Sequence, residues 1–127
     1  MIELVQTDKA PSAIGPYSQA VIAKGMVYTS GQIALSPGGT DELLNEGVIV
    51  QAVRVMKNLE AVLEEAGSSL DSVVKTTIFL ADMGDFALVN EVYSEAFGMH
   101  KPARATVAVK TLPKNALVEI DAIALLK

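Results

Sequence analysis

Cysteine and tryptophan are absent from this 127-residue chain, which has one histidine, three phenylalanines and three tyrosines. The lack of cysteine excludes disulfides, thiolate catalysis and cysteine-bound metal sites. The only histidine is His100, so a histidine-rich metal site is excluded as well. A histidine triad with its usual partners remains possible in principle.

Clusters of lysine and arginine are also missing, and the formal net charge is −5. Without a basic patch, binding to nucleic acid or to an anionic membrane is not expected. No apolar run approaches the roughly 20 residues that a membrane-spanning helix needs. Residues 1–11 lack a basic region followed by a long apolar core, so no signal peptide is expected there. These absences predict a cytoplasmic, soluble protein.

Hydrophobic residues make up 50% of the chain, and most of them are aliphatic. The length suits one domain with a real core over residues 1–127. The apolar share is slightly high for a small monomer, which predicts that some apolar surface is buried between subunits.

Periodicity predicts most of the secondary structure. The pattern indicates a strand at 2–6, a hairpin of 18–23 and 26–30 around Lys24-Gly25, and a loop at 36–40. Apolar residues at helical spacing begin near Glu46 and end at Gly67, a typical C-cap residue. The β-branched stretch 73–81 predicts a strand. A second helix follows over 86–97, with Asp85 as its N-cap and Gly98 at its end.

Two further apolar runs, 103–109 and 117–126, flank a turn-like segment at 112–115, which predicts a closing hairpin. The order of elements is then β, ββ, α, β, α, ββ. This order predicts an α+β domain in which two helices cover one face of a sheet of about six strands.

Charged residues interrupt both closing runs. Alternation along a strand places Arg104 and Thr106 on one face of the first run, and Glu119 and Asp121 on one face of the second. An ion pair between Arg104 and Glu119, or exposure of both to water on an open sheet face, explains them structurally. In the functional alternative, Arg104 is a fork that binds a substrate carboxylate, and a nearby carboxylate handles a proton or a water.

Four separated motifs, in this order, resemble the signature of the RidA (reactive intermediate deaminase, YjgF-type) family. They are G-P-Y-S-Q-A from Gly15, S-G-Q from Ser30, V-N-E-V-Y around Asn90, and H-K-P-A-R followed by L-P and V-E-I from His100 to Ile120. The resemblance covers nearly the whole chain, and the ordered set is far more specific than any one motif.

The resemblance implies a chorismate-mutase-like (bacillus type) α+β fold with a six-stranded mixed sheet, assembled as a homotrimer with ligand clefts between adjacent subunits. It implies hydrolysis of 2-aminoacrylate-type enamines and their imines, such as 2-iminobutanoate and 2-iminopropanoate, to 2-keto acids and ammonia. Enzymes that use pyridoxal phosphate release these species, whereas members of this family carry no cofactor.

The resemblance also implies roles for individual residues. Arg104 would bind the substrate carboxylate, and Glu119 would hold the attacking water and shuttle a proton. The remaining residues implied in substrate binding are Tyr17 at the rim of the cleft, Ser30, Gly31, Asn90 and Thr106. Asp121 ranks below Glu119 as a second carboxylate of the site or a residue at the centre of an oligomer, and His100 is expected to be structural.

One position departs from the family pattern. Many bacterial deaminases of this family have cysteine two residues after the arginine, where this chain has Thr106. The backbone at Thr106 can still contact the substrate, because that contact does not depend on the side chain. A function that depends on a thiol is excluded. The change is also compatible with a different substrate preference.

Three other functions remain open. A regulatory module could bind a 2-keto acid or another carboxylate in the same cleft without turnover. The family also carries the label endoribonuclease, which the acidic charge and the lack of a histidine pair disfavour. A chorismate mutase is suggested by fold analogy alone.

Overall fold

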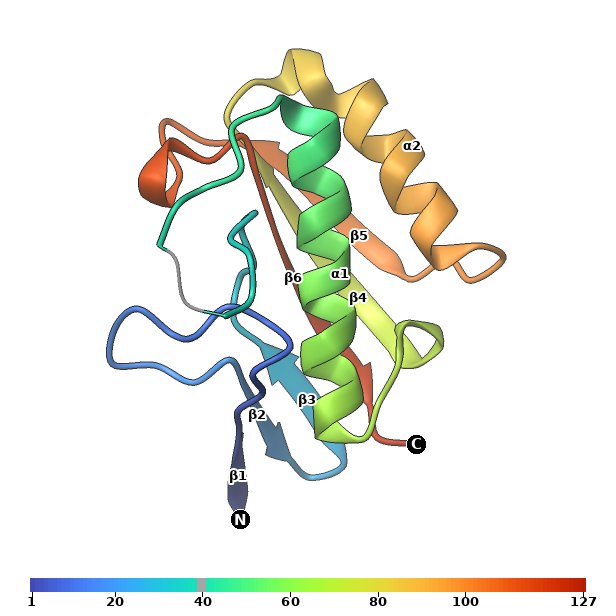
Figure 1. Ribbon diagram of the computed structural model, residues 1–127. Coiled ribbons are helices and arrows are strands. Elements are labelled where there is room, and N and C mark those ends of the chain that lie inside the picture. Colours follow the sequence, from blue (N-terminus) through green and yellow to red (C-terminus); the bar gives the residue numbers. More distant parts are fainter. Residues whose placement is uncertain (39–40) are drawn as a thin grey trace.

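The computed structural model describes residues 1–38 and 41–127, so the predicted loop at 36–40 lies partly outside the described residues. Two helices, α1 (Val48–Ala66) and α2 (Phe86–Phe97), cover one face of a six-stranded sheet (Figure 1). The strand order is β1-β2-β3-β6-β4-β5. The strands are β1 (Ile2–Val5), β2 (Ala20–Ala23), β3 (Met26–Thr29), β4 (Val73–Leu80), β5 (Ala103–Ala108) and β6 (Val118–Leu125). The predicted α+β fold, with a mixed sheet and helices on one face, is confirmed.

The turn between β2 and β3 forms where the sequence predicts it. Lys24 and Gly25 both have positive φ angles, 51° and 77°, and the flanking strands pair antiparallel with Ala23 opposite Met26. Two successive left-handed residues match the twist of the strands that they join, which is why a Lys-Gly pair closes this hairpin.

The predicted closing hairpin is wrong. β5 pairs in parallel with β4, with Thr76 opposite Arg104, and β6 pairs antiparallel with the other edge of β4. β4 therefore lies between the two strands that were expected to pair. α2 is the crossover connection that allows β5 to lie beside β4 and parallel to it. The connection over 109–117 then passes the end of β4 to reach β6 on its other side.

The helix ends agree with the sequence in part. Gly67 adopts the left-handed conformation after α1 and donates its N–H to the carbonyl of Glu64, and Gly98 follows α2. Asp85 precedes α2 but its side chain makes no capping hydrogen bond. Asp82 instead accepts from the N–H of Gly84 at 2.8 Å, because the turn before α2 begins there. Neither helix is long and apolar enough to cross a membrane, in the part of the chain that the structure describes.

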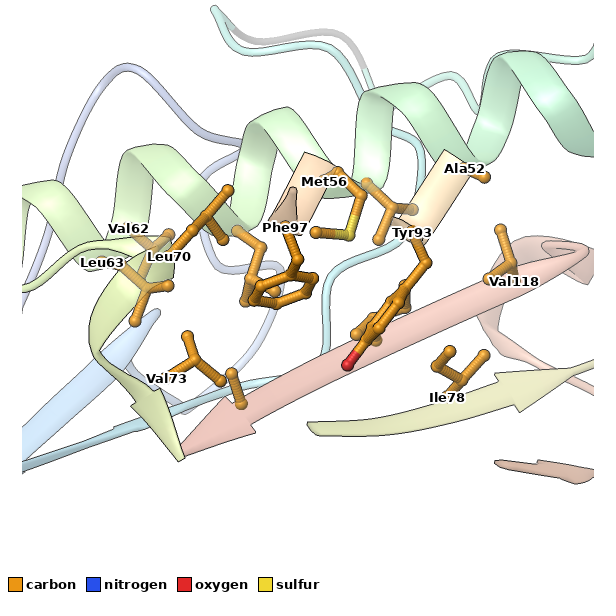
Figure 2. Packing of buried hydrophobic residues seen from close by; sticks show 14 of the residues in the cluster. Ala52, Met56, Val62, Leu63, Leu70, Val73, Ile78, Tyr93, Phe97 and Val118 are labelled. Carbon is orange, nitrogen blue, oxygen red and sulfur yellow. The ribbon is translucent and has the colours of Figure 1, made fainter. Parts of the chain in front are cut away.

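The core lies between the helices and the sheet, where Met56 of α1, Tyr93 and Phe97 of α2, and Ile78 and Val118 of the sheet meet (Figure 2). β6 alternates strictly. Its buried residues point toward the helices, while the residues between them point to the opposite, helix-free face. The buried set is Val118, Ile120, Ala122 and Ala124. We call the helix-free side of the sheet the open face.

A buried asparagine ties α1 to the loop after β3. Asn58, which is fully buried, donates to the carbonyls of Ile33 and Leu35 at 3.1 and 2.9 Å. Its carbonyl oxygen accepts from Nε of Arg54 at 3.0 Å. Buried carbonyls without a partner are costly, so this one side chain keeps the loop packed on the helix.

We predict that Asn58→Ala lowers the free energy of unfolding by about 1–3 kcal/mol, because two buried carbonyls lose their donors. Urea unfolding at matched protein concentration measures the change. Lys57→Ala, one residue earlier and exposed, serves as the control and should stay within about 0.5 kcal/mol of the parent protein. Equal effects of the two substitutions would contradict the role assigned to Asn58.

Candidate functional site

The strand register places Arg104 and Glu119 on opposite faces of the sheet. Arg104 is opposite Thr76, which is buried beneath the helices, and Glu119 is opposite Phe79 on the open face. Paired residues of neighbouring strands point to the same side of a sheet. Arg104 thus lies on the helix side and Glu119 on the open side, so one chain by itself does not bring the two together.

Glu119 borders a small hollow of about 70 Å³, here called the Glu119 hollow. The loop 11–17 forms one wall, the segment 31–35 a second, and Pro113 closes the third side. Of the residues implied in the site, Tyr17, Gly31 and Glu119 meet here, while Ser30 is not among the lining residues. Tyr17 is exposed at the rim.

Gly31 makes room for the Glu119 carboxylate. The next residue, Gln32, exchanges both backbone hydrogen bonds with Ile120 at 2.9 and 3.1 Å, which sets Gly31 beside Glu119. A Cβ atom built on Gly31 would lie 2.7 Å from Cδ of Glu119, far closer than real contacts allow. The missing side chain is therefore what lets the carboxylate lie against this backbone.

Two polar side chains of the predicted motifs hold the loops in place. Gln19 is buried, accepts from the N–H of Thr7 at 2.7 Å, and donates to the carbonyl of Pro11 at 2.7 Å. Ser30 donates its hydroxyl to the carbonyl of Ser18 at 2.6 Å. These bonds fix the loop that carries Tyr17. Gln19 itself lines the hollow, whereas Ser30 only holds the loop in position.

Electrostatics favour a protonatable carboxyl at Glu119. Burial raises the pKa of Glu119 above its usual value of 4.5, and the neighbouring Asp121 carboxylate raises it further. Burial also raises the pKa of Asp121, partly offset by a hydrogen bond from the backbone of Thr77 and by the charge of Lys75. A carboxyl with a raised pKa both accepts and returns a proton more readily near neutral pH.

Arg104 borders a second, larger depression of about 430 Å³ between β5 and α2, here called the Arg104 cleft. Nη1 of Arg104 donates to Oδ1 of Asn90 at 2.7 Å, so the structure brings these two implied site residues together. Ser94, His100 and Lys101 also line the cleft. Arg104 is exposed, and its remaining N–H groups are directed at no other side chain in the described residues.

The other singled-out residues have simpler environments. The hydroxyl of Thr106 is buried on the helix side and has no hydrogen-bond partner among the residues that the structure describes, and Thr106 does not line the Arg104 cleft. His100 lies 2.7 Å from the carbonyl of Val73 through Nε2, which fits the expected structural role. Asp121 lies on the open face, opposite Thr77.

Sequence reasoning missed several residues around both depressions. Gln19, Gln32 and Pro113 shape the Glu119 hollow, and Phe86 and Tyr93 lie beside Arg104. Pro113 belongs to the L-P pair of the motif, so its place in the pattern was a usable signal. Tyr93 likewise ends the V-N-E-V-Y motif, whereas Phe86 has only the pattern of an ordinary core position in an amphipathic helix. Only the position of β5 beside α2 reveals the contact of both rings with the arginine.

Comparisons with known proteins agree on one family. The family model described as Endoribonuclease L-PSP matches residues 7–126. A relative from Mus musculus, 2-iminobutanoate/2-iminopropanoate deaminase, is 48% identical over 122 residues, which are 96% of this chain and 90% of the relative. The crystal structure of RidA from an Antarctic Psychrobacter superimposes with a TM-score of 0.92 at 47% identity, covering 98% of this chain and 99% of the other. The structure of E. coli TdcF with bound serine has the same TM-score at 41% identity, again covering 98% of this chain and 99% of the other.

We predict that Gly31→Ala displaces the Glu119 carboxylate and shifts its pKa back toward 4.5, because the new Cβ expels it into water. Titration of the Glu119 carboxyl carbon by NMR measures the shift. Gly15→Ala in the opposite wall is the control, since its Cβ would meet Tyr17 at an ordinary 3.6 Å. A carboxyl that titrates identically in the parent protein and in Gly31→Ala would refute the crowding.

Proposed function

Because this chain belongs to the RidA (YjgF, L-PSP) family, we infer that it is a 2-iminobutanoate/2-iminopropanoate deaminase. Its substrates are the reactive imines and enamines, such as 2-aminoacrylate, that pyridoxal-phosphate enzymes release, and its products are 2-keto acids and ammonia. The mouse relative bears the name of this activity, and E. coli TdcF binds serine, a small molecule with the same carboxylate as these substrates.

The observation that carries this proposal is the separation of two complementary half-sites. The Arg104 cleft offers an exposed guanidinium for a carboxylate, and the Glu119 hollow offers a carboxyl with a raised pKa. Each is open, and they face away from each other across the sheet. A complete site therefore needs Arg104 of one subunit beside the Glu119 hollow of a neighbour, as in a homotrimer with clefts between subunits.

The open face supports such an assembly. Large apolar side chains on it remain exposed, among them Leu4 at 72% and Leu125 at 48%. Tyr28 and Val107 lie on the same face, each 43% exposed. Uncovered apolar surface of this kind supports an interface between copies of the chain, because burying it there is favourable by about 25 cal/mol per Å².

The proposed chemistry follows from the two half-sites. Arg104 binds the substrate carboxylate through two N–H groups and so places the imine carbon next to Glu119. The substrate reacts as its protonated imine. The Glu119 carboxylate takes a proton from a water molecule while the water oxygen bonds to the imine carbon, and the C=N π electrons move onto the nitrogen to give a neutral carbinolamine. Glu119 then gives that proton to the amino nitrogen. As the C–N bond breaks and ammonia leaves, the Glu119 carboxylate takes the proton of the carbinolamine hydroxyl, the carbonyl of the 2-keto acid forms, and Glu119 passes this last proton to the departing ammonia.

A binding function without turnover is the second candidate. Bound serine in E. coli TdcF shows a ligand held by that relative, and the Arg104 cleft here suits a carboxylate whether or not it reacts. Arg104 is required in either case, whereas Glu119 sets a rate only in the enzyme. Kinetics therefore separate the two functions.

The first test of the proposal uses a dehydratase that generates 2-aminoacrylate and 2-aminocrotonate in situ, with keto-acid release followed over time. We expect the parent protein to accelerate release and Arg104→Ala to lower kcat/KM roughly 10- to 100-fold, the worth of a charge-assisted carboxylate bond. Lys57→Ala, on the outer face of α1, is the control because it also removes one positive charge. Its kcat/KM should equal that of the parent protein. No acceleration by the parent, with 2-ketobutyrate still bound, would replace the enzyme by the binding function.

The pH dependence tests the role of Glu119. Its carboxylate must be ionised to take a proton from water, so kcat/KM should fall as pH drops through a pKa that lies above 4.5. In Glu119→Gln this acidic limb should disappear and kcat/KM should be lower by about 100-fold or more. An unchanged limb in Glu119→Gln would assign the proton transfer to another group.

The shared site predicts complementation between two inactive variants. Arg104→Ala and Glu119→Gln subunits, unfolded and refolded together in equal amounts, should regain roughly one quarter of the parent activity, because a working site needs an intact arginine and an intact glutamate from neighbours. The same variants mixed without unfolding are the control and should stay inactive. Refolded mixtures that remain inactive, although mixed assemblies are isolated with two different tags, would exclude a site between subunits.

A further inference from the structure

The guanidinium of Arg104 lies against two aromatic rings of α2. Its Cζ atom is 5.0 Å from the centre of the Tyr93 ring and 5.5 Å from the centre of the Phe86 ring. Both distances fall within the range in which a ring face attracts a cation. Phe86, Asn90 and Tyr93 are spaced four and three residues apart, so they form one stripe of α2 that faces β5.

Tyr93 is itself held in place. Its hydroxyl lies 2.7 Å from the hydroxyl of Thr76, the residue directly opposite Arg104 in the sheet, and its ring contacts Phe97 at 4.6 Å between centres. Figure 2 shows the ring reaching from α2 down to the sheet, and only 8% of the residue is exposed. Because the Tyr93 ring is held in place by these contacts, the contact between ring and guanidinium restricts the arginine and not the ring.

We propose that Phe86, Asn90 and Tyr93 form a clamp that orients the Arg104 guanidinium for an incoming carboxylate. They are positioning residues, because they act on the ligand only through Arg104. The identification of the ligand as the carboxylate of a small imino or keto acid rests on the proposed function. The clamp itself rests on the contacts within this chain.

The chemistry of the three side chains suits this task. An arginine on an exposed edge strand populates many rotamers, and ordering it at the moment of binding weakens affinity. Ring faces and a neutral amide hold the cation without supplying a negative charge. A carboxylate in place of Asn90 would form an ion pair with Arg104 and compete with the ligand. The clamp therefore orders the guanidinium and leaves its charge and its remaining N–H groups available.

The alternative is that Tyr93 and Phe86 only fill the core, and four variants separate the two explanations. Tyr93→Phe keeps the ring and removes the hydroxyl. Tyr93→Leu and Phe86→Leu each remove one ring face. Val89→Ala, a buried position of the same helix, matches the loss of packing without a ring, and thermal unfolding of every variant measures that loss.

Two measurements report on the arginine. In the NMR spectrum, ring currents should shift the side-chain resonances of Arg104 upfield in the parent protein, in Tyr93→Phe and in Val89→Ala, and less in each leucine variant. In calorimetric titration with 2-ketobutyrate, each leucine variant should bind about two- to fivefold more weakly, the worth of one exposed cation–π contact. KM for the imine should rise by the same factor while kcat changes less.

The outcomes are distinguishable. Leucine variants that lose thermal stability but keep the Arg104 shift and the affinity for 2-ketobutyrate would overturn the clamp, as would an equal loss of affinity in Val89→Ala. If the parent protein fails to accelerate imine hydrolysis while the ring-current shift and its loss in the leucine variants persist, the proposed function is wrong and the clamp stands.

Discussion

The position of β4 between β5 and β6 is the constraint on which the rest of the structure depends. Its two edges set the register of both strands that carry the candidate chemistry, with Arg104 opposite Thr76 and Glu119 opposite Phe79. Because the side chains of β4 alternate, these two pairs point to opposite sides of the sheet. The cation and the carboxyl are thereby separated by a layer of backbone, so one chain by itself does not bring them together.

Each half-site is built by its own local device. At the Glu119 hollow, a glycine and a backbone bridge through Gln32 bring the carboxylate against the chain, and burial raises its pKa. At the Arg104 cleft, a stripe of α2 holds the guanidinium by ring faces and one amide. The surroundings of Glu119 change the basicity of its carboxylate, and the surroundings of Arg104 change the orientation of its guanidinium. The proposed hydrolysis of an imine, a species that already reacts with water, asks for little more than these two effects.

Much of this could be predicted from the sequence, because the signals are local. The Lys24-Gly25 turn, the end of α1 at Gly67 and the alternation of β6 follow from φ angles and side-chain periods that neighbouring residues decide. The closing hairpin was wrong for the same reason. Two apolar runs around a turn have the same sequence pattern whether the strands pair with each other or with a third strand. The order of the strands in the sheet depends on contacts between residues far apart in the chain.

The sequence by itself determined which residues have the right chemistry and which of them share a strand face, as Arg104 shares one with Thr106 and Glu119 with Asp121. Only the tertiary structure decided how those faces relate to each other. It placed Arg104 against the rings of α2, moved Glu119 to the open face, and left each without the other. The reason is physical: alternation along a strand is set by bonds between neighbours, whereas the side that a strand presents to the core is set by hydrophobic burial over the whole chain.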